Sequence, residues 1–227
     1  MKTGLIIAGG SIDDAFVLDY MEQNMGGLDE IIAVDGALET AKRLGVEPTI
    51  IVGDFDTVSK WTLEEFKQNS RAKWIRLQPE KDATDMEMAL DSALEAGCKR
   101  IVFLGALGGR MDHALANIHL LYKAEKQGAS CQILDRQNRI RVLTKTETFY
   151  KSEAFGTYIS FIPLSTHVKG LTLRGFKYPL RGYDLTIGVS LGVSNELADE
   201  ECTVEFQEGV LLCLETRDEK GETKIDG

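Results

Sequence analysis

The fold is decided by the stretch from Pro48 to Thr57, which reads PTIIVGDFDT. Its first half is a short, unbroken apolar run, the pattern of a strand that is covered on both faces in a parallel sheet. Two carboxylates, Asp54 and Asp56, follow this run with one residue between them. At the carboxyl end of a buried strand such a pair concentrates negative charge, and a divalent metal ion is its natural partner.

The same rhythm recurs through the first half of the chain. Short apolar runs lie at residues 5–8, 31–34, 50–52, 74–77, 101–104 and 131–134, and helical patterns lie between them at 13–24, 37–44, 60–69, 84–96 and 111–127. This alternation predicts right-handed crossovers and a parallel sheet, that is, a Rossmann-like α/β domain over residues 1–136. The loops that follow the strands then share one edge of the sheet, where ligands bind in this architecture.

The pattern changes after residue 136. β-rich segments follow at 139–143, 157–162, 168–173, 185–190, 202–206 and 210–215, and glycines separate them. Many short strands with turn residues between them are typical of an all-β sandwich. We therefore expect a second, β-sandwich domain over residues 137–227 that ends in a charged tail from Arg217 onward.

The amino-acid composition limits the kinds of molecule that the protein can bind. The 26 Lys and Arg against 36 Asp and Glu give a net charge of -10, which argues against nucleic acid and against an anionic membrane surface. The four cysteines lack metal-ligand spacing and predict buried thiols in a reducing compartment. No apolar run approaches the roughly 18 residues of a membrane span, and the amino terminus lacks a signal-peptide pattern. We expect a cytoplasmic protein that binds small molecules.

Polar groups follow four of the predicted strands and converge on one edge. They are Asp35, then Asp54 and Asp56, then Lys81, Asp82 and Asp85, and finally Gly108, Gly109, Arg110, Asp112, His113 and Asn117. Single members have structural explanations: Asp35 suits a turn or a helix N-cap, and Asp85 suits the first turn of a helix that Thr84 and Glu87 cap. Five or six carboxylates on one edge repel one another unless a cation is bound, so together they predict a metal site.

The glycine-rich loop complements the carboxylates. Gly108 and Gly109 let backbone N–H groups approach a phosphate, a helix starts directly afterwards, and Arg110 can bind phosphate oxygens in a bidentate manner. Carboxylates for Mg²⁺ beside a phosphate loop predict a site for nucleotide phosphoryl transfer. In the helix that follows, we expect a core face that leaves Asp112, His113 and Asn117 toward the site or solvent. The expected core residues are Met111, Ala114, Leu115, Ile118 and Leu121.

Five motifs occur in one order over about residues 5–215. They are DGA at 35–37, GDFDT at 53–57, KDATD at 81–85, GGRMDH at 108–113 with Asn117, and SN at 194–195. In these motifs the chain resembles the thiamine pyrophosphokinases of bacterial type. The resemblance implies a catalytic α/β domain, a thiamine-binding β-sandwich, and a homodimer whose active sites are shared across subunits. It also implies transfer of the pyrophosphoryl group of ATP to the hydroxyethyl group of thiamine, which gives thiamine diphosphate and AMP.

The resemblance also implies roles for single residues. Asp54, Asp56 and Asp85 correspond to the Mg²⁺ site, with Asp35 and Asp82 in its acidic surroundings. The remaining polar residues correspond to the side that binds ATP: Lys81, Gly108, Gly109, Arg110, Asp112, His113 and Asn117. Either Asp82 or Asp85 would accept or orient the alcohol proton.

The β-sandwich would hold the cationic substrate. Tyr178 stands where animal members of the family carry a Trp that stacks on the pyrimidine ring, and a Tyr face still attracts such a ring. Ser194 and Asn195 are candidates to hydrogen-bond the aminopyrimidine edge, although a polar β-turn explains this pair as well.

Two other functions fit parts of the pattern. Asp54 and Asp56 also match the Asp-x-Asp opening of aspartyl-phosphate phosphatases, but they follow the third strand, and Gly53 interrupts the strand before them. That interpretation leaves the glycine-rich loop and the β-sandwich without a role. A non-catalytic sensor of a nucleotide or of thiamine is the second alternative.

Overall fold

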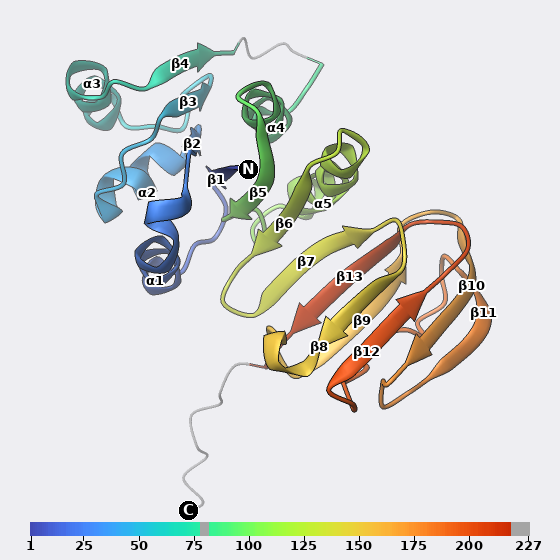
Figure 1. Ribbon diagram of the computed structural model, residues 1–227. Helices are drawn as coiled ribbons and strands as arrows, with labels where there is room; N and C mark the ends of the chain where they lie inside the picture. The colour runs from blue at the N-terminus through green and yellow to red at the C-terminus, as the bar shows by residue number, and fades with distance from the viewer. Residues whose placement is uncertain (78–81, 219–227) are drawn as a thin grey trace, which may run out of the picture. The chain divides into compact units, whose positions relative to one another are not determined.

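The computed structural model describes residues 1–77 and 82–218, and the chain divides into two compact units, Met1–Arg136 and Gln137–Gly227 (Figure 1). Within the described ranges, no helix combines the length and the apolar character that a membrane crossing needs.

The first unit is built on six parallel strands. In chain order its elements are β1 (Lys2–Ile7), α1 (Asp14–Asn24), the short 3₁₀ helix η1 (Met25–Gly27), β2 (Glu30–Val34), α2 (Ala37–Leu44), β3 (Ile50–Gly53), α3 (Lys60–Asn69), β4 (Lys73–Arg76), α4 (Asp85–Glu95), β5 (Cys98–Leu104), α5 (Met111–Lys126) and β6 (Ser130–Leu134). The strands lie in the order β4-β3-β2-β1-β5-β6. The order reverses beside β1, so the crevice of this sheet lies at the carboxyl ends of β1 and β5.

The helices cover both faces of this sheet. Figure 1 shows α1, α2 and α3 on one side of the strands and α4 and α5 on the other. The central strands are buried on both faces, as the unbroken apolar runs predicted: Leu5, Ile6 and Ile51 have no exposed surface. Burial of each such side chain contributes about 1.5–3 kcal/mol, and this packing fixes the strand ends that carry the polar loops.

The second unit is an antiparallel sandwich. Its elements are β7 (Asn138–Leu143), β8 (Glu147–Tyr150), the 3₁₀ helix η2 (Lys151–Glu153), β9 (Tyr158–Pro163), β10 (His167–Arg174), β11 (Leu180–Thr186), β12 (Glu201–Glu205) and β13 (Leu211–Thr216). In one sheet β13 pairs with β7 and β9, and the other sheet has the order β11-β10-β12-β8. Phe149, Phe161 and Phe176 meet edge to face between the sheets, with ring centroids 5.5–6.4 Å apart. These contacts close the core of the sandwich.

A buried carboxylate fixes one end of β13. The Glu215 side chain is only 3% exposed, and its two oxygens accept hydrogen bonds from Arg139 at 2.9 and 2.5 Å. The Phe155 N–H donates to the same carboxylate at 3.3 Å, and the Arg141 guanidinium lies 3.7 Å away. These partners compensate the cost of burying the Glu215 carboxylate.

The structure confirms the predicted fold class, with two corrections. The expected strand at 185–190 is in fact β11, which ends at Thr186, and the apolar residues that follow it are exposed. In α5 the expected core residues Met111 and Leu115 are 67% and 52% exposed. The buried face of α5 contains Asn117 instead, because this side chain bonds to a backbone carbonyl of the β5–α5 loop.

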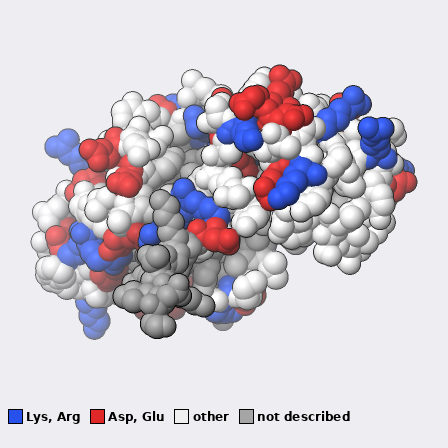
Figure 2. Space-filling model, turned by 90° about the horizontal axis from the view of Figure 1, so that it is seen from below, with Lys and Arg blue, Asp and Glu red and all other residues white. Residues whose placement is uncertain are grey.

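Charged side chains are interspersed over the surface. Figure 2 shows one face of the molecule, on which Lys and Arg alternate with Asp and Glu and no single sign covers it. The net charge of -10 therefore does not form one continuous acidic field on this face. The carboxylate cluster at the sheet edge has to be explained by its own geometry.

Candidate active site

Three carboxylates meet at the carboxyl ends of β2 and β3. Asp35, Asp54 and Asp56 each offer an oxygen, and these oxygens lie within 4.8 Å of one another. Asp35 and Asp54 are partly buried, and Asp56 is exposed. The charge of Asp54, with smaller contributions from burial and Asp35, raises the pKa of the Asp56 carboxyl above its ordinary value. The three charges repel one another, and a bound cation would relieve this repulsion.

The loop after β3 is built around Asp35. One Asp35 oxygen accepts a hydrogen bond from the Phe55 N–H at 3.0 Å, and the other accepts from the Thr57 hydroxyl at 2.5 Å. Asp35 and Phe55 both adopt left-handed backbone angles, with φ of 45° and 67°. Residues other than glycine rarely adopt this backbone conformation. The loop is therefore strained, as is common at functional sites.

Glycine is required where the two strand ends approach each other. Gly53 has φ of 156°, and a Cβ atom there would lie 3.0 Å from the Asp35 Cα. No larger residue fits this approach without moving the backbone that carries Asp35. Gly53 thus interrupts the apolar run for a geometric reason: it brings the Asp54 loop against the Asp35 loop.

A cleft of about 570 Å³ lies along this edge of the first unit. Its walls come from the loops after four strands: Gly9 and Gly10 after β1, Asp35 and Gly36 after β2, Thr57 after β3, and Gly105, Ala106, Gly108, Gly109 and Arg110 after β5. Thr84, Asp85 and Met86 at the start of α4 and His113 and Asn117 on α5 complete it. This volume is in the range of small-molecule sites.

The amino terminus of α4 contributes Asp85 to the wall of the cleft. Thr84 caps the helix by accepting from the Glu87 N–H at 3.2 Å, while the Glu87 carboxylate pairs with Lys123 on α5 instead of returning to the cap. Asp85 lines the cleft, and its charge also contributes to the raised pKa of Asp56. Asp82 is exposed, and Lys81 lies outside the described residues.

The loop between β5 and α5 has the features of a phosphate cradle. Gly108 and Gly109 adopt φ of 84° and 68°, and the loop leads into the amino terminus of α5. Arg110 is exposed and donates two hydrogen bonds to Asp112, at 3.1 and 2.6 Å. This guanidinium lowers the pKa of the Asp112 carboxyl to about 2. Asp112 thereby holds Arg110 at the helix terminus, where an anion is favoured.

Buried Asn117 braces the same loop from α5. Its amide nitrogen donates to the Ala106 carbonyl at 2.8 Å, and the side chain is only 6% exposed. His113 lies on the cleft wall one turn earlier and is exposed. The structure therefore brings Asn117 to the site as a support of the loop that carries Gly108 and Gly109.

Sequence reasoning missed the loop after β1. Gly9 and Gly10 line the cleft, and the Gly10 N–H donates to the Gly105 carbonyl at 3.0 Å. Two glycines directly after the first apolar run were the available signal. Thr57, whose hydroxyl bonds to Asp35, was quoted in the GDFDT motif but was not assigned a role.

The three candidate residues of the second unit lie close together in the fold. Tyr178 is 58% exposed, Ser194 is exposed with φ of 56°, and Asn195 is buried. The Asn195 side chain bonds to the backbone of Tyr178. The Ser194 N–H donates to the Ser160 hydroxyl at 3.0 Å. The exposed Tyr178 ring offers a flat face for a ligand.

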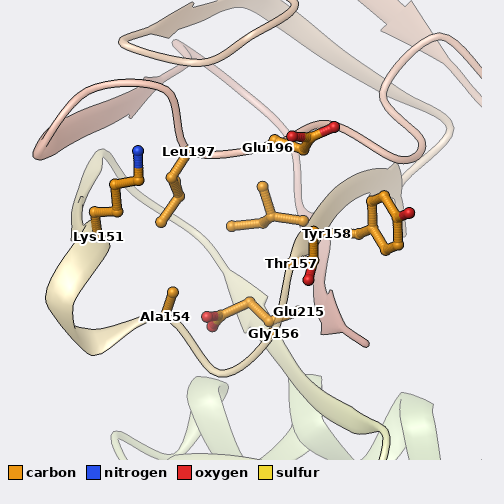
Figure 3. Close-up of a pocket in the computed structure, with 9 residues that line it drawn as sticks. Lys151, Ala154, Gly156, Thr157, Tyr158, Glu196, Leu197 and Glu215 are labelled. Atoms are coloured by element: carbon orange, nitrogen blue, oxygen red, sulfur yellow. The ribbon is translucent and has the colours of Figure 1, made fainter. Parts of the chain in front are cut away.

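A separate pocket of about 230 Å³ lies in the second unit between η2 and the segment that carries Glu196 and Leu197. Figure 3 shows its lining, with Lys151 and Ala154 on one side and Glu215 at its base. The Glu215 carboxylate is already paired with Arg139, and the Lys151 ammonium donates to the Ala198 carbonyl at 3.1 Å. The pocket is smaller than most ligand sites, and its charged groups already have partners.

The fold and the cleft together define a class of protein: α/β enzymes that transfer phosphate groups from a nucleotide. Comparisons with known proteins narrow the class. Residues 22–133 match the family model described as thiamin pyrophosphokinase, catalytic domain, and residues 146–211 match thiamin pyrophosphokinase, vitamin B1 binding domain. The chain is 37% identical over 221 residues to the thiamine pyrophosphokinase of Bacillus subtilis, a match that covers 96% of this chain and 100% of that protein. The chain belongs to the thiamine pyrophosphokinase family.

Solved structures agree with this assignment. The crystal structure of the Bacillus subtilis thiamine pyrophosphokinase superposes with a TM-score of 0.83 at 36% identity, over 96% of this chain and 100% of that one. The Geobacillus thermodenitrificans thiamin pyrophosphokinase gives 0.82 at 33% identity, over 96% and 99%. The yeast thiamin pyrophosphokinase gives 0.79 at 16% identity over 95% and 86%, which is a likeness of fold alone.

Proposed function

We propose that this chain is a thiamine pyrophosphokinase, which transfers the pyrophosphoryl group of ATP to the hydroxyethyl group of thiamine and releases AMP. The observation that carries the proposal is the cleft of the first unit, where Asp35 of the carboxylate cluster and Asp85 line the same cavity as the loop of Gly108, Gly109 and Arg110, in a member of this family. An aspartyl-phosphate phosphatase would use Asp54 as a nucleophile, and it would leave the second unit without a role.

Mg²⁺ is the metal that the carboxylate cluster fits. Oxygens of two ligands on one octahedral Mg²⁺ lie about 3–4 Å apart, and the three carboxylates are held within 4.8 Å. Asp54 and Asp56 would hold the ion, with Asp35 beside them and Asp85 facing them from the start of α4. When bound, the ion neutralises phosphate charge and lowers the barrier to attack at phosphorus.

The chain's own residues divide the remaining work. Gly108, Gly109 and the amino terminus of α5 bind ATP phosphates through N–H groups, and Arg110 adds a bidentate contact that Asp112 keeps in position. Lys81 belongs to the same ATP-binding side by resemblance. His113 and Asn117 complete the wall of the cleft and support the loop.

The alcohol of thiamine needs a group that orients it or accepts its proton. We assign this role to Asp85 in preference to Asp82, because Asp85 lines the cleft and Asp82 is exposed outside it. The second unit binds the cationic substrate through the ring of Tyr178, with Ser194 and Asn195 at the same corner. A Tyr face contributes about 0.5–2 kcal/mol to binding of such a ring.

One incubation tests the proposal. The purified chain with ATP, Mg²⁺ and thiamine is expected to give AMP and thiamine diphosphate in equal amounts on chromatography. Release of inorganic phosphate from ATP or from phosphorylated substrates, with acid-stable label on the protein, would show a phosphatase. Ligand binding without AMP would show a sensor.

We also propose that the chain works as a homodimer. The segment after β11 exposes four apolar side chains in alternation: Ile187 at 65%, Val189 at 39%, Leu191 at 49% and Val193 at 45%. Such a run is costly to leave in water, and a second copy of the chain would cover it. Light scattering is expected to give twice the 25.1 kDa of one chain, and Ile187→Glu with Leu191→Glu is expected to return the mass to that of one chain.

We also propose that the protein is cytoplasmic, and the state of its thiols supports this. Cys98, Cys131, Cys202 and Cys213 are all buried and free, as suits a reducing cytoplasm. Fractionation of cells that express the chain is expected to recover it with cytosolic markers.

A further inference from the structure

Asn195 is a buried polar residue that joins two parts of the second unit. Its backbone exchanges hydrogen bonds with Ile159 of β9, at 2.8 and 2.9 Å. Only 3% of the residue is exposed. A buried carboxamide at this depth needs partners for both of its polar atoms, and these partners show what it does.

The side chain is committed to the backbone of Tyr178. The Asn195 Nδ2 donates to the Tyr178 carbonyl at 2.8 Å, and Oδ1 accepts from the Tyr178 N–H at 2.9 Å. The same Oδ1 accepts from the Glu196 N–H at 2.9 Å. Both lone-pair positions of the oxygen are therefore used within the protein, and little is left for a ligand.

This contact continues a short antiparallel ladder. Phe176 pairs with Leu197, and the Lys177 N–H donates to the Glu196 carbonyl at 3.0 Å. The Lys177 ammonium also lies 2.6 Å from the Glu196 carboxylate. At Tyr178 the ladder continues through the Asn195 side chain. Its carboxamide presents one acceptor and one donor to the Tyr178 N–H and carbonyl, as a backbone partner on a neighbouring strand would.

Two further features concern Tyr178, one its backbone and the other its ring. Pro179 follows it and restricts its backbone to extended conformations. The ring itself is 58% exposed, and the Lys177 ammonium lies 5.6 Å from its centroid. The backbone is thus held from both sides while the aromatic face stays open.

We propose that Asn195 is a positioning residue: it holds the backbone of Tyr178 so that the exposed ring is preset to stack on the pyrimidine of thiamine. The inference rests on the proposed function and refines the expectation that Asn195 itself contacts the substrate. A ring held in its binding position loses less conformational freedom when substrate arrives, which improves affinity.

A double-mutant cycle on the full chain tests this role. Tyr178→Ala and Asn195→Ala are each expected to raise the KM for thiamine about tenfold, and to leave the KM for ATP unchanged. The double variant is expected to show the same KM for thiamine as Tyr178→Ala alone, because Asn195 acts only through the ring.

A control variant separates an effect on substrate binding from a loss of stability. Val204→Ala removes core volume from β12 of the same unit and is expected to lower stability without a change in the KM for thiamine. If Asn195→Ala is too unstable to assay, Asn195→Ser replaces it, since a hydroxyl leaves a smaller cavity, adds no buried charge and is too short to hold both backbone groups of Tyr178.

Effects that multiply in the double variant, to about a hundredfold, would overturn the positioning role, because Asn195 would then bind substrate independently. An Asn195 variant with a normal KM for thiamine, or with an equal rise in the KM for ATP, would also overturn it. A wild-type chain that forms no thiamine diphosphate would instead overturn the proposed function.

Discussion

In the first unit, Met1–Arg136, Gly10 lies where the loop after β1 packs against the loop after β5, and it leaves very little space for a side chain. A Cβ atom at Gly10 would lie 2.3 Å from the Gly105 carbonyl oxygen and 2.8 Å from that of Leu107. Carbon and oxygen atoms in contact ordinarily lie more than about 3.2 Å apart, so Gly10→Ala has to separate the two loops by about 1 Å. Overpacking of this kind costs about 1–3 kcal/mol of unfolding free energy.

The same displacement moves the phosphate loop. A misplacement of about 1 Å in a substrate-positioning group costs roughly a hundredfold in rate, so we expect kcat/KM for ATP to fall by that amount in Gly10→Ala. Urea unfolding followed by circular dichroism measures the stability, and initial rates at saturating thiamine measure the effect on ATP.

Gly26 in η1 is the matched control, because a Cβ atom there meets nothing within 4 Å among the described residues. Gly26→Ala is expected to change stability by less than about 1 kcal/mol and to keep full activity. Normal kcat/KM for ATP in Gly10→Ala, or an equal loss in Gly26→Ala, would refute the argument from close approach.

Three further predictions follow from the same structure. Asp56→Asn is expected to lower turnover about a hundredfold or more while leaving the melting temperature unchanged or higher, because the substitution removes repulsion in the cluster; a variant that loses stability and keeps activity would contradict the metal assignment. Glu215→Ala leaves Arg139 without its buried partner and is expected to cost about 2–4 kcal/mol, discounted for the partial exposure of the arginine; a calorimetric melting temperature within a degree of wild type would contradict it. Asp112 is expected to titrate near pH 2 by carboxyl NMR, so the stabilisation from its pairing with Arg110 is fully present above the ordinary carboxyl pKa of 3.8 and is lost progressively as the pH falls from there through about 2; Arg110→Ala should return this pKa toward its ordinary value.

Local patterns were sufficient for most elements of the catalytic unit. Short apolar runs bounded by Gly or Asp placed its strands, and the helices at 37–44 and 60–69 begin and end where the sequence predicted. The central strands are predictable because a strand that is buried on both faces consists of consecutive apolar residues, a pattern that is visible in the sequence itself.

Elements governed by distant contacts were harder to predict. The apolar alternation from Ile187 to Val193 resembles a strand, but these side chains are exposed and β11 ends before them. Asn117 was expected to face the site or solvent, and it does line the cleft, but its burial was not visible because its partner, the Ala106 carbonyl, is eleven positions away.

The candidate site shows the same division. The acidic residues could be identified in the sequence, and because they follow predicted parallel strands, they were expected at one edge of the sheet. The contacts from Asp35 to Phe55 and Thr57, and from Asn195 to Tyr178, join segments about twenty positions apart, so no local pattern showed them.

The central claim is that both terminal phosphates of ATP move together to thiamine. ATP with separate isotopic labels on the β and γ phosphorus, incubated with Mg²⁺ and thiamine, tests this claim directly. We predict that both labels appear in thiamine diphosphate with one unlabelled AMP for each product molecule. Formation of ADP with thiamine monophosphate, or of labelled inorganic phosphate without thiamine diphosphate, would contradict the account.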